Sequence, residues 1–237
     1  MKSAFAKGVS NGIPIALGYF SVSFGFGISA VNLGISAFHA FIISLTNLTS
    51  AGQLMGITII AAGGTLIEMA ATQFIINLRY SLMAITLSQK LSDKFNTFHR
   101  MFVAFGITDE IFAVAVSRHG KIDPSYMYGL ISVSALGWTS GTVAGSVANM
   151  LLPETLAVAM GIMLYGMFIA IIVPPARKSG KVLTVVLISA GISTCFYYLV
   201  PSLPSGFAII ISAVIAAVAG ALLFPVEEEK ETEAEEQ

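Results

Sequence analysis

Long apolar runs recur along the chain, and short polar stretches separate them. A run of about 20 apolar residues is long enough to cross the hydrocarbon core of a bilayer as a helix. None of the runs shows the apolar-polar alternation of a transmembrane β-barrel strand, and open sheets cannot leave backbone unpaired in lipid. The pattern predicts an all-α polytopic membrane protein, a bundle of about six to eight hydrophobic segments. The segments are Gly8–Val31, Ile35–Ala62, Thr65–Leu87, Met101–Ser117, Tyr126–Leu152, Leu156–Val173, Val182–Val200 and Gly206–Phe224.

The second segment is interrupted by a polar stretch, Thr46–Gln53, which holds five polar side chains and Gly52 within eight residues. Broken helices at the middle of a membrane expose unpaired backbone groups and are a frequent substrate or ion site in transporters. We therefore expect two half-helices here. The alternative is a continuous helix whose small residues pack tightly against a neighbour.

The third segment carries Glu68 and Arg79, with Gln73 and Asn77 between them. Ionisable groups at membrane depth are costly and are a functional-site hypothesis by default. Eleven residues along an ideal helix put Glu68 and Arg79 on one face, within about 20°, but about 16 Å apart along the axis. Arg79 therefore needs a partner from another segment. The alternative is that Glu68 lies at one interface and Arg79 reaches the other.

The fourth segment is short and holds Thr108-Asp109-Glu110 near its middle. Two adjacent carboxylates in an apolar run repel each other and are costly to ionise, which makes a proton carrier a reasonable hypothesis. One of them is also a candidate partner for Arg79. A purely structural alternative is the first turn of a half-helix, where carboxylates satisfy free N–H groups.

Basic residues concentrate in the loops 88–100, 118–124 and 176–181 and at the N-terminus. The positive-inside rule places all four on the cytoplasmic side. This requires the second and fourth segments to be re-entrant, which leaves six full crossings and puts both termini inside. Seven or eight ordinary spans remain as the alternative if the rule is violated once.

Composition narrows the function classes. Hydrophobic residues make up 56% and charged residues 11% of the 237 residues, and the mean hydropathy is +0.85, whereas soluble domains are about a quarter charged. We expect one transmembrane transporter domain over residues 1–225 and a disordered acidic tail over 226–237, which carries seven of the 13 acidic residues. Nothing in this charge pattern indicates a nucleic-acid partner.

The side chains that bind metals or perform catalysis are sparse. Cys195 is a single cysteine and the three histidines are far apart, so neither a disulfide nor a metal site is expected. No glycine-rich phosphate loop precedes a lysine, which argues against ATP hydrolysis. An intramembrane enzyme that uses Asp109 and Glu110 as acid and base would lack a nucleophile motif. We therefore predict that the chain is not an enzyme and needs no cofactor.

Several short motifs, in this order, resemble the large subunit of the azaleucine-resistance (AzlC-type) branched-chain amino-acid exporters of bacteria and archaea. The resemblance covers nearly the whole chain up to the acidic tail. Two departures are Tyr80, where the family usually has histidine after the arginine, and the tail itself. The motifs are Gly12-Ile13-Pro14, Gly18, Phe24-Gly25, Ser50-Ala51-Gly52-Gln53, Asn77-Leu78-Arg79-Tyr80, Thr108-Asp109-Glu110 with Phe112-Ala113, and Trp138 with Gly141 and Gly145.

The resemblance implies export of leucine, isoleucine and valine, with methionine as a further candidate. It also implies a small hydrophobic membrane subunit of the AzlD type as the partner, and a multi-pass location in a prokaryotic cell membrane. Rival readings are a channel-like pore of broader specificity, and a structural subunit whose partner carries the site.

An amino-acid substrate needs an anion binder, a cation binder and an apolar pocket. We expect the carboxylate at the N-terminus of the half-helix after Ser50-Ala51-Gly52, where free N–H groups favour negative charge; Arg79 is the alternative anchor. Asp109 or Glu110 would bind the ammonium group, with Gln53 and Asn77 as neutral donors or acceptors. Trp138 is a candidate pocket wall, or simply part of the core. Coupling to the proton gradient through the carboxylate pair is a further hypothesis.

Overall fold

The computed structural model describes residues 3–151, 153, 155, 166, 169 and 172–225. They form two compact units, Met1–Ile169 and Ala170–Gln237, each of which is described by itself. The described residues form helices and no named strand, so the predicted all-α membrane fold is confirmed. Among them, four helices are long and apolar enough to cross a membrane: α1 (Ala4–Asn32), α7 (Pro124–Leu151), α9 (Gly180–Leu199) and α10 (Ser205–Leu223).

Two of the sequence predictions concern residues beyond this description. The acidic tail, 226–237, and most of the segment Leu156–Val173 lie outside the described residues. The expectation of a single transporter domain over residues 1–225 stays a prediction.

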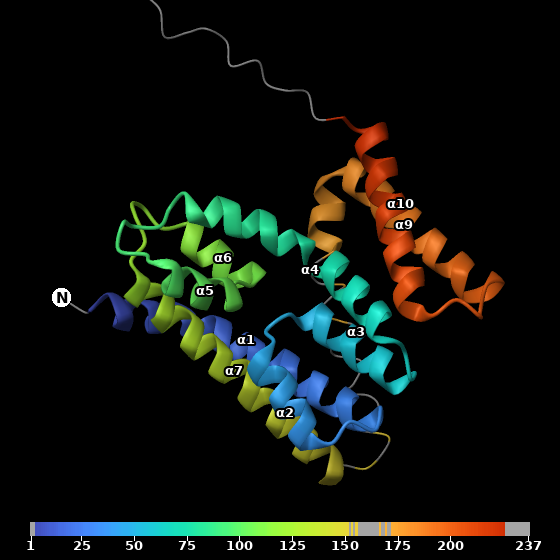
Figure 1. Cartoon of the computed structure of the whole chain (residues 1–237), viewed down its shortest axis with the longest axis horizontal. Helices are drawn as coiled ribbons and strands as arrows, with labels where there is room; N and C mark the ends of the chain where they lie inside the picture. The colour runs from blue at the N-terminus through green and yellow to red at the C-terminus, as the bar shows by residue number, and fades with distance from the viewer. Residues whose placement is uncertain are drawn as a thin grey trace, which may run out of the picture. The chain divides into compact units, whose positions relative to one another are not determined.

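Helices α1 and α7 pack side by side and run in the same direction (Figure 1). Near their starts Gly8 lies against Tyr126, and near their ends Gly27 lies against Ser146. Their N-terminal ends therefore lie together, in agreement with the common side predicted for the N-terminus and the loop 118–124.

A first hairpin consists of α2 (Ala37–Thr46) and α3 (Ser50–Ala61), so the predicted break in the second segment is confirmed. The gap covers only residues 47–49, which is narrower than the predicted stretch, and Ser50 and Gly52 lie in the first turn of α3. Ile60, near the end of α3, lines the same groove as Gly34 and His39 at the start of α2. The chain thus returns to the end from which it entered. Helices of 10 and 12 residues extend about 15–18 Å, roughly half a hydrocarbon core.

A second hairpin consists of α5 (Thr97–Phe105) and α6 (Asp109–Val116). At its base His99 bonds Tyr128 in the first turns of α7, and the Lys90 ammonium donates to the carbonyl of Val116 at the end of α6. Both ends of this hairpin therefore lie near the N-terminal end of α7. The two hairpins enter from opposite ends of the α1–α7 pair (Figure 1), as the re-entrant second and fourth segments of the predicted topology require.

Helix α4 (Leu66–Ser88) runs from the first hairpin to the second. Its start is fixed by Thr65, whose hydroxyl accepts from the Glu68 backbone N–H at 3.1 Å. Thr65 and Glu68 have the spacing of a capping box, and a carboxylate in the first turn also favours the positive end of the helix. Glu68 is buried, with 4% of its surface exposed. Its position in the first turn gives Glu68 a structural role at the start of α4.

The loops at the base of the second hairpin are tied together by the backbone of Ile122, which bonds Lys90 and Ser92 at 2.9 Å each. Next to it, the exposed Asp123 carboxylate lies 3.2 Å from the Lys94 ammonium and accepts from the Ser92 hydroxyl at 3.1 Å. The Lys94 contact, followed by the Ser92 hydrogen bond, lowers the pKa of Asp123 below its ordinary value.

We expect Asp123 to contribute a small stabilisation that acid removes. Because the folded pKa is the lower one, this contribution is present above the unfolded pKa of about 4 and is lost as the pH falls through the folded pKa. The unfolding temperatures of the wild-type chain and of Asp123→Asn should differ slightly at about pH 6, and the difference should shrink as the pH is lowered below about 4. A difference that grows on acidification would contradict this assignment. The effect is small because exposed ion pairs contribute little.

In the unit Ala170–Gln237, α9 and α10 lie against each other, so the seventh and eighth predicted segments are confirmed. The pair is antiparallel, since Lys181 at the start of α9 lies near the ring of Phe224 at the end of α10. A side chain at Gly220 would lie 2.7 Å from the Val185 side chain, so glycine permits the close approach.

Candidate functional site

The two hairpins present unlike helix N-termini at their tips. Helix α6 is capped by Thr108, whose hydroxyl accepts from the Ile111 N–H at 3.3 Å, and its first turn holds Asp109 and Glu110. The cap residue of α3, Thr49, makes no such capping bond, and no acidic residue lies in that helix's first turn. A free helix N-terminus attracts anions. One tip is therefore electropositive, whereas the other carries two carboxylates.

Helix α4 contacts both tips through polar side chains in its middle. The Gln73 amide donates to the Gly52 carbonyl at 2.7 Å and accepts from Asn77 at 3.1 Å. A side chain at Gly52 would collide with the Thr49 hydroxyl and lie 2.7 Å from the Gln73 oxygen, so these neighbours would have to move. Arg79 binds Asp109 of the second hairpin. Gln73 and Arg79 are about 9 Å apart along the helix axis, so one short stretch of α4 connects the two hairpins.

Arg79 is held by two neighbours. Its guanidinium lies 2.6 Å from the Asp109 carboxylate, donates to the Tyr80 hydroxyl at 3.2 Å and lies 4.9 Å from the Tyr80 ring centre. The side chains of Arg79 and Asp109 are 39% and 35% exposed, which leaves both open to a ligand. Tyr80, the departure from the family pattern, thus positions the arginine.

We call the residues that join the two tips the hairpin cluster: Gly52, Gln73, Asn77, Arg79, Asp109 and Glu110. Tyr19 of α1 is a further member, which sequence reasoning missed. Its hydroxyl donates to the Glu110 carboxylate at 2.5 Å and lies 2.5 Å from the Thr108 hydroxyl. Its ring meets the edge of Trp138, with 5.4 Å between the ring centres. Tyr19 therefore connects the second tip to α1 and α7.

Gln53 and Trp138 are both fully buried and bond to each other. The Trp138 ring N–H donates to the Gln53 oxygen at 3.0 Å, and the Gln53 amide donates to the carbonyls of Ile43 and Asn47. These contacts occupy the polar atoms of both side chains and connect the first tip to α7. The two residues therefore support the tip, and their direct contact with a substrate stays a prediction.

The remaining predicted site residues are Ser50, on the first tip, and Asn77, on α4. Ser50 is the first residue of α3 and is half-buried. The Asn77 side-chain oxygen is buried and has no hydrogen-bond partner among the residues that the structure describes. The structure thus connects Ser50, Gly52, Gln53 and Asn77 around the first tip, and Arg79 to the carboxylates of the second. Within the same described ranges, no three His, Cys, Asp or Glu side chains gather as a metal site.

Comparison with known proteins identifies the family of the chain. The sequence model of the AzlC protein family matches residues 14–152, more than half of the chain. The chain belongs to the AzlC family. The matched region runs from the first half of α1 through both hairpins to the end of α7, and so contains the whole cluster.

Relatives lie in both bacteria and archaea. The inner membrane protein YgaZ of Escherichia coli K12 is 27% identical over 196 residues, covering 79% of this chain and 80% of that protein. An uncharacterized membrane protein of Archaeoglobus fulgidus is 29% identical over 225 residues, covering 94% and 95%. One of Helicobacter pylori 26695 is 25% identical over 150 residues, covering 62% and 64%. No solved structure matches the chain.

These matches make the chain a membrane protein of a transporter-type family rather than of an enzyme family. The family therefore supports a role in membrane transport.

Proposed function

We propose that the chain exports branched-chain amino acids (leucine, isoleucine and valine, with methionine as a further candidate) as the large subunit of a two-component exporter. The observation that carries this proposal is the pair of unlike helix N-termini. A free amino acid carries a carboxylate and an ammonium group, and the hairpin tips offer a complement to each: an uncapped, acid-free N-terminus at α3 and two carboxylates at α6.

In this proposal the substrate carboxylate binds the first-turn N–H groups of α3, around Ser50 and Gly52, with Asn77 beside them. Glu110 takes the ammonium group. Glu110 bonds the neutral Tyr19 hydroxyl, and no cation pairs with it among the described side chains, whereas Asp109 is paired with Arg79. For the aliphatic side chain we assign the neighbourhood of Tyr19 and Trp138, whose rings are buried in this structure. Arg79 is the alternative carboxylate anchor.

The hairpins also support an alternating mechanism. They enter from opposite ends of the α1–α7 pair and both contact α4, so displacing either tip opens the cluster toward a different end. Re-entrant and broken helices serve this purpose in known transporters. Proton coupling would require a carboxylate that exchanges between a proton and the substrate, and Glu110 is our candidate.

The test uses the purified chain in liposomes, with and without its small AzlD-type partner, under an imposed pH gradient. We expect efflux and counterflow of labelled leucine, isoleucine and valine, and much slower movement of lysine or glutamate. Glu110→Gln should abolish the response to the pH gradient and also slow the exchange of labelled for unlabelled leucine, because Glu110 binds the ammonium group in this proposal. Gradient-driven transport that survives this substitution would show that Glu110 is not the proton carrier.

The same assay separates the rivals. A channel-like pore would conduct without counterflow and without discrimination among amino acids. A structural subunit would bind no leucine when purified alone and would bind it only with the partner. For the location we propose a prokaryotic cell membrane with both termini in the cytoplasm, which accessibility labelling of cysteines placed at residues 3 and 225 would test.

A further inference from the structure

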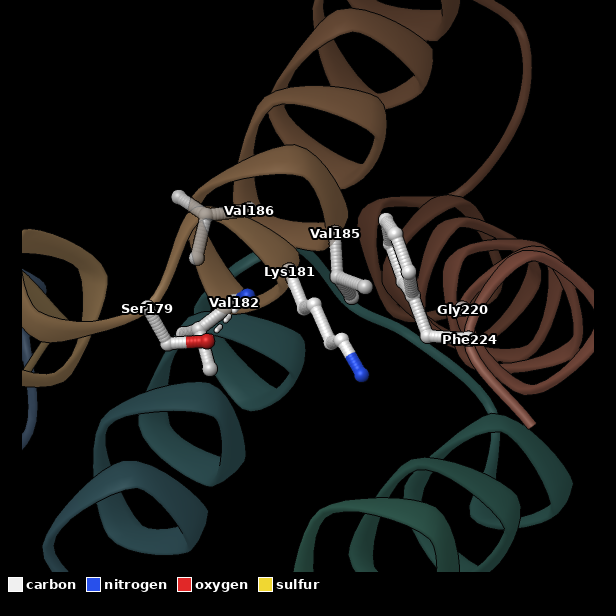
Figure 2. A pocket seen from close by; sticks show the side chains of 7 residues that line it. All are labelled: Ser179, Lys181, Val182, Val185, Val186, Gly220 and Phe224. Carbon is white, nitrogen blue, oxygen red and sulfur yellow. Dashed lines mark hydrogen bonds between the residues drawn. The ribbon is translucent and has the colours of Figure 1, made fainter. Parts of the chain in front are cut away.

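The unit Ala170–Gln237 contains a groove between α9 and α10, of about 400 Å³. Figure 2 shows its lining side chains, with Lys181 extending from α9 and Phe224 facing it from α10. Seven residues line it: Ser179, Lys181, Val182, Val185, Val186, Gly220 and Phe224. None of its lining residues belongs to the hairpin cluster, and the transport proposal does not use them.

The lining changes character with depth. Ser179 and Lys181 lie at the start of α9, and Phe224 follows the end of α10, so one end of the groove lies where two membrane-spanning helices end. Val185 and Val186 lie one turn farther into α9, about 6–8 Å deeper. The groove is therefore polar at headgroup depth and apolar where the acyl chains begin.

The polar end is cationic. Lys181 is exposed, its ammonium lies 5.9 Å from the Phe224 ring centre, and no carboxylate pairs with it in the described part of the chain. Arg177 and Lys178 are also exposed just before it. Basic clusters at the cytoplasmic end of membrane helices attract anionic lipid headgroups.

We propose that this groove binds one anionic phospholipid, with its phosphate on Lys181 and the start of an acyl chain along Val182, Val185 and Phe224. The groove combines a cation with an apolar channel at the depths where such a lipid has its phosphate and its first methylenes. A zwitterionic lipid would gain less from Lys181 because its own cation accompanies the phosphate. The chain's seven tail glutamates, which follow Phe224 in sequence, are the competing occupant.

The test is a lipid titration of the full-length chain in detergent, read by native mass spectrometry. Phosphatidylglycerol should bind more tightly than phosphatidylcholine of the same chain length, and inorganic phosphate should not stabilise the protein in a thermal-shift assay, because it lacks the acyl chain. Lys181→Gln should weaken phosphatidylglycerol binding about fivefold. The matched control is Lys178→Gln. It removes the same charge three residues before Lys181, but Lys178 does not line the groove, so this variant should have a smaller effect.

Three results would overturn the proposal. Equal affinity for the two lipids would remove the role of charge. Equal losses in Lys181→Gln and Lys178→Gln would mean diffuse attraction to the basic segment rather than a site. A lipid preference that is absent in the wild-type chain and emerges only when the seven tail glutamates are changed to glutamine would identify the tail as the occupant.

Discussion

Arg79→Gln is expected to reduce gradient-driven leucine efflux by roughly tenfold or more while leaving the chain folded. The substitution removes the guanidinium that lies 2.6 Å from the Asp109 carboxylate. Among the described residues, this is the only ion pair that joins α4 to the second hairpin. An uncompensated carboxylate at the α6 N-terminus then competes with Glu110 for the substrate ammonium group. The measurement is efflux from liposomes, with thermal unfolding and size-exclusion profiles to verify folding.

The charge-reversed pair Arg79→Asp with Asp109→Arg separates the two roles open to Arg79. If the arginine only holds the second hairpin, the reversed pair restores a substantial part of the activity, and the double-mutant cycle shows coupling between the two sites. If Arg79 binds the substrate carboxylate, the reversed pair stays inactive and repels that carboxylate. Restored activity would assign Arg79 to holding the hairpin. An inactive reversed pair would favour substrate binding only if Asp109→Arg alone keeps the chain folded, because a cation in the first turn of α6 is itself unfavourable.

The chain offers a matched control in the pair Lys94–Asp123, an ion pair of 3.2 Å in the loops at the base of the second hairpin. Lys94→Gln removes one charge, as Arg79→Gln does, but lies outside the cluster. Its efflux should remain close to wild type. If Lys94→Gln and Arg79→Gln lowered efflux equally, the loss would follow from general electrostatics and the role of Arg79 would be refuted.

The sequence allowed the hairpins to be predicted because their signals are local. A polar stretch around Asn47 inside an apolar run favours a break in a membrane helix. In the structure α2 ends and α3 begins at this stretch. Thr108-Asp109-Glu110 has the residue types of a helix start, and α6 begins there. The basic loops predicted that these two segments are re-entrant. If all the basic loops lie on one side of the membrane, the second and fourth segments cannot both cross it.

The contacts that complete the cluster could not be predicted because they are long-range. Tyr19 lies 89 residues from Thr108 and 91 from Glu110. Its surroundings in sequence are an ordinary glycine-rich apolar segment, where a tyrosine carries no local signal. The bonds between Ser44 and Thr142, at 2.7 Å, and between Gln53 and Trp138 depend in the same way on the packing of the first hairpin against α7. Hydropathy and charge patterns do not determine which helices are neighbours.

Gly141→Ala is the second substitution with a large expected effect, and it acts on the α1–α7 pair that supports both hairpins. A Cβ at Gly141 would fall on the carbonyl of Phe20 and the hydroxyl of Ser23, with the Phe20 Cα at 2.8 Å. Backbone atoms cannot move aside as a side-chain end can, so the two helices must separate. Overpacking of this kind costs about 1–3 kcal/mol, and small residues are what allow membrane helices to approach closely. We expect a clearly lowered unfolding temperature of the purified chain and reduced leucine efflux.

Gly18→Ala on α1 is the matched control, because a Cβ at Gly18 meets nothing within 4 Å. The same chemical change there should be neutral or slightly stabilising, since alanine favours a helix over glycine by about 1 kcal/mol. The two variants differ only in whether the added methyl group faces the other helix. If both lowered the unfolding temperature equally, glycine flexibility would explain the result and the close contact would not. The other outcome is that Gly141→Ala alone destabilises the chain and abolishes efflux. That result would connect the packing of α1 against α7, which positions Tyr19 and Trp138, to transport.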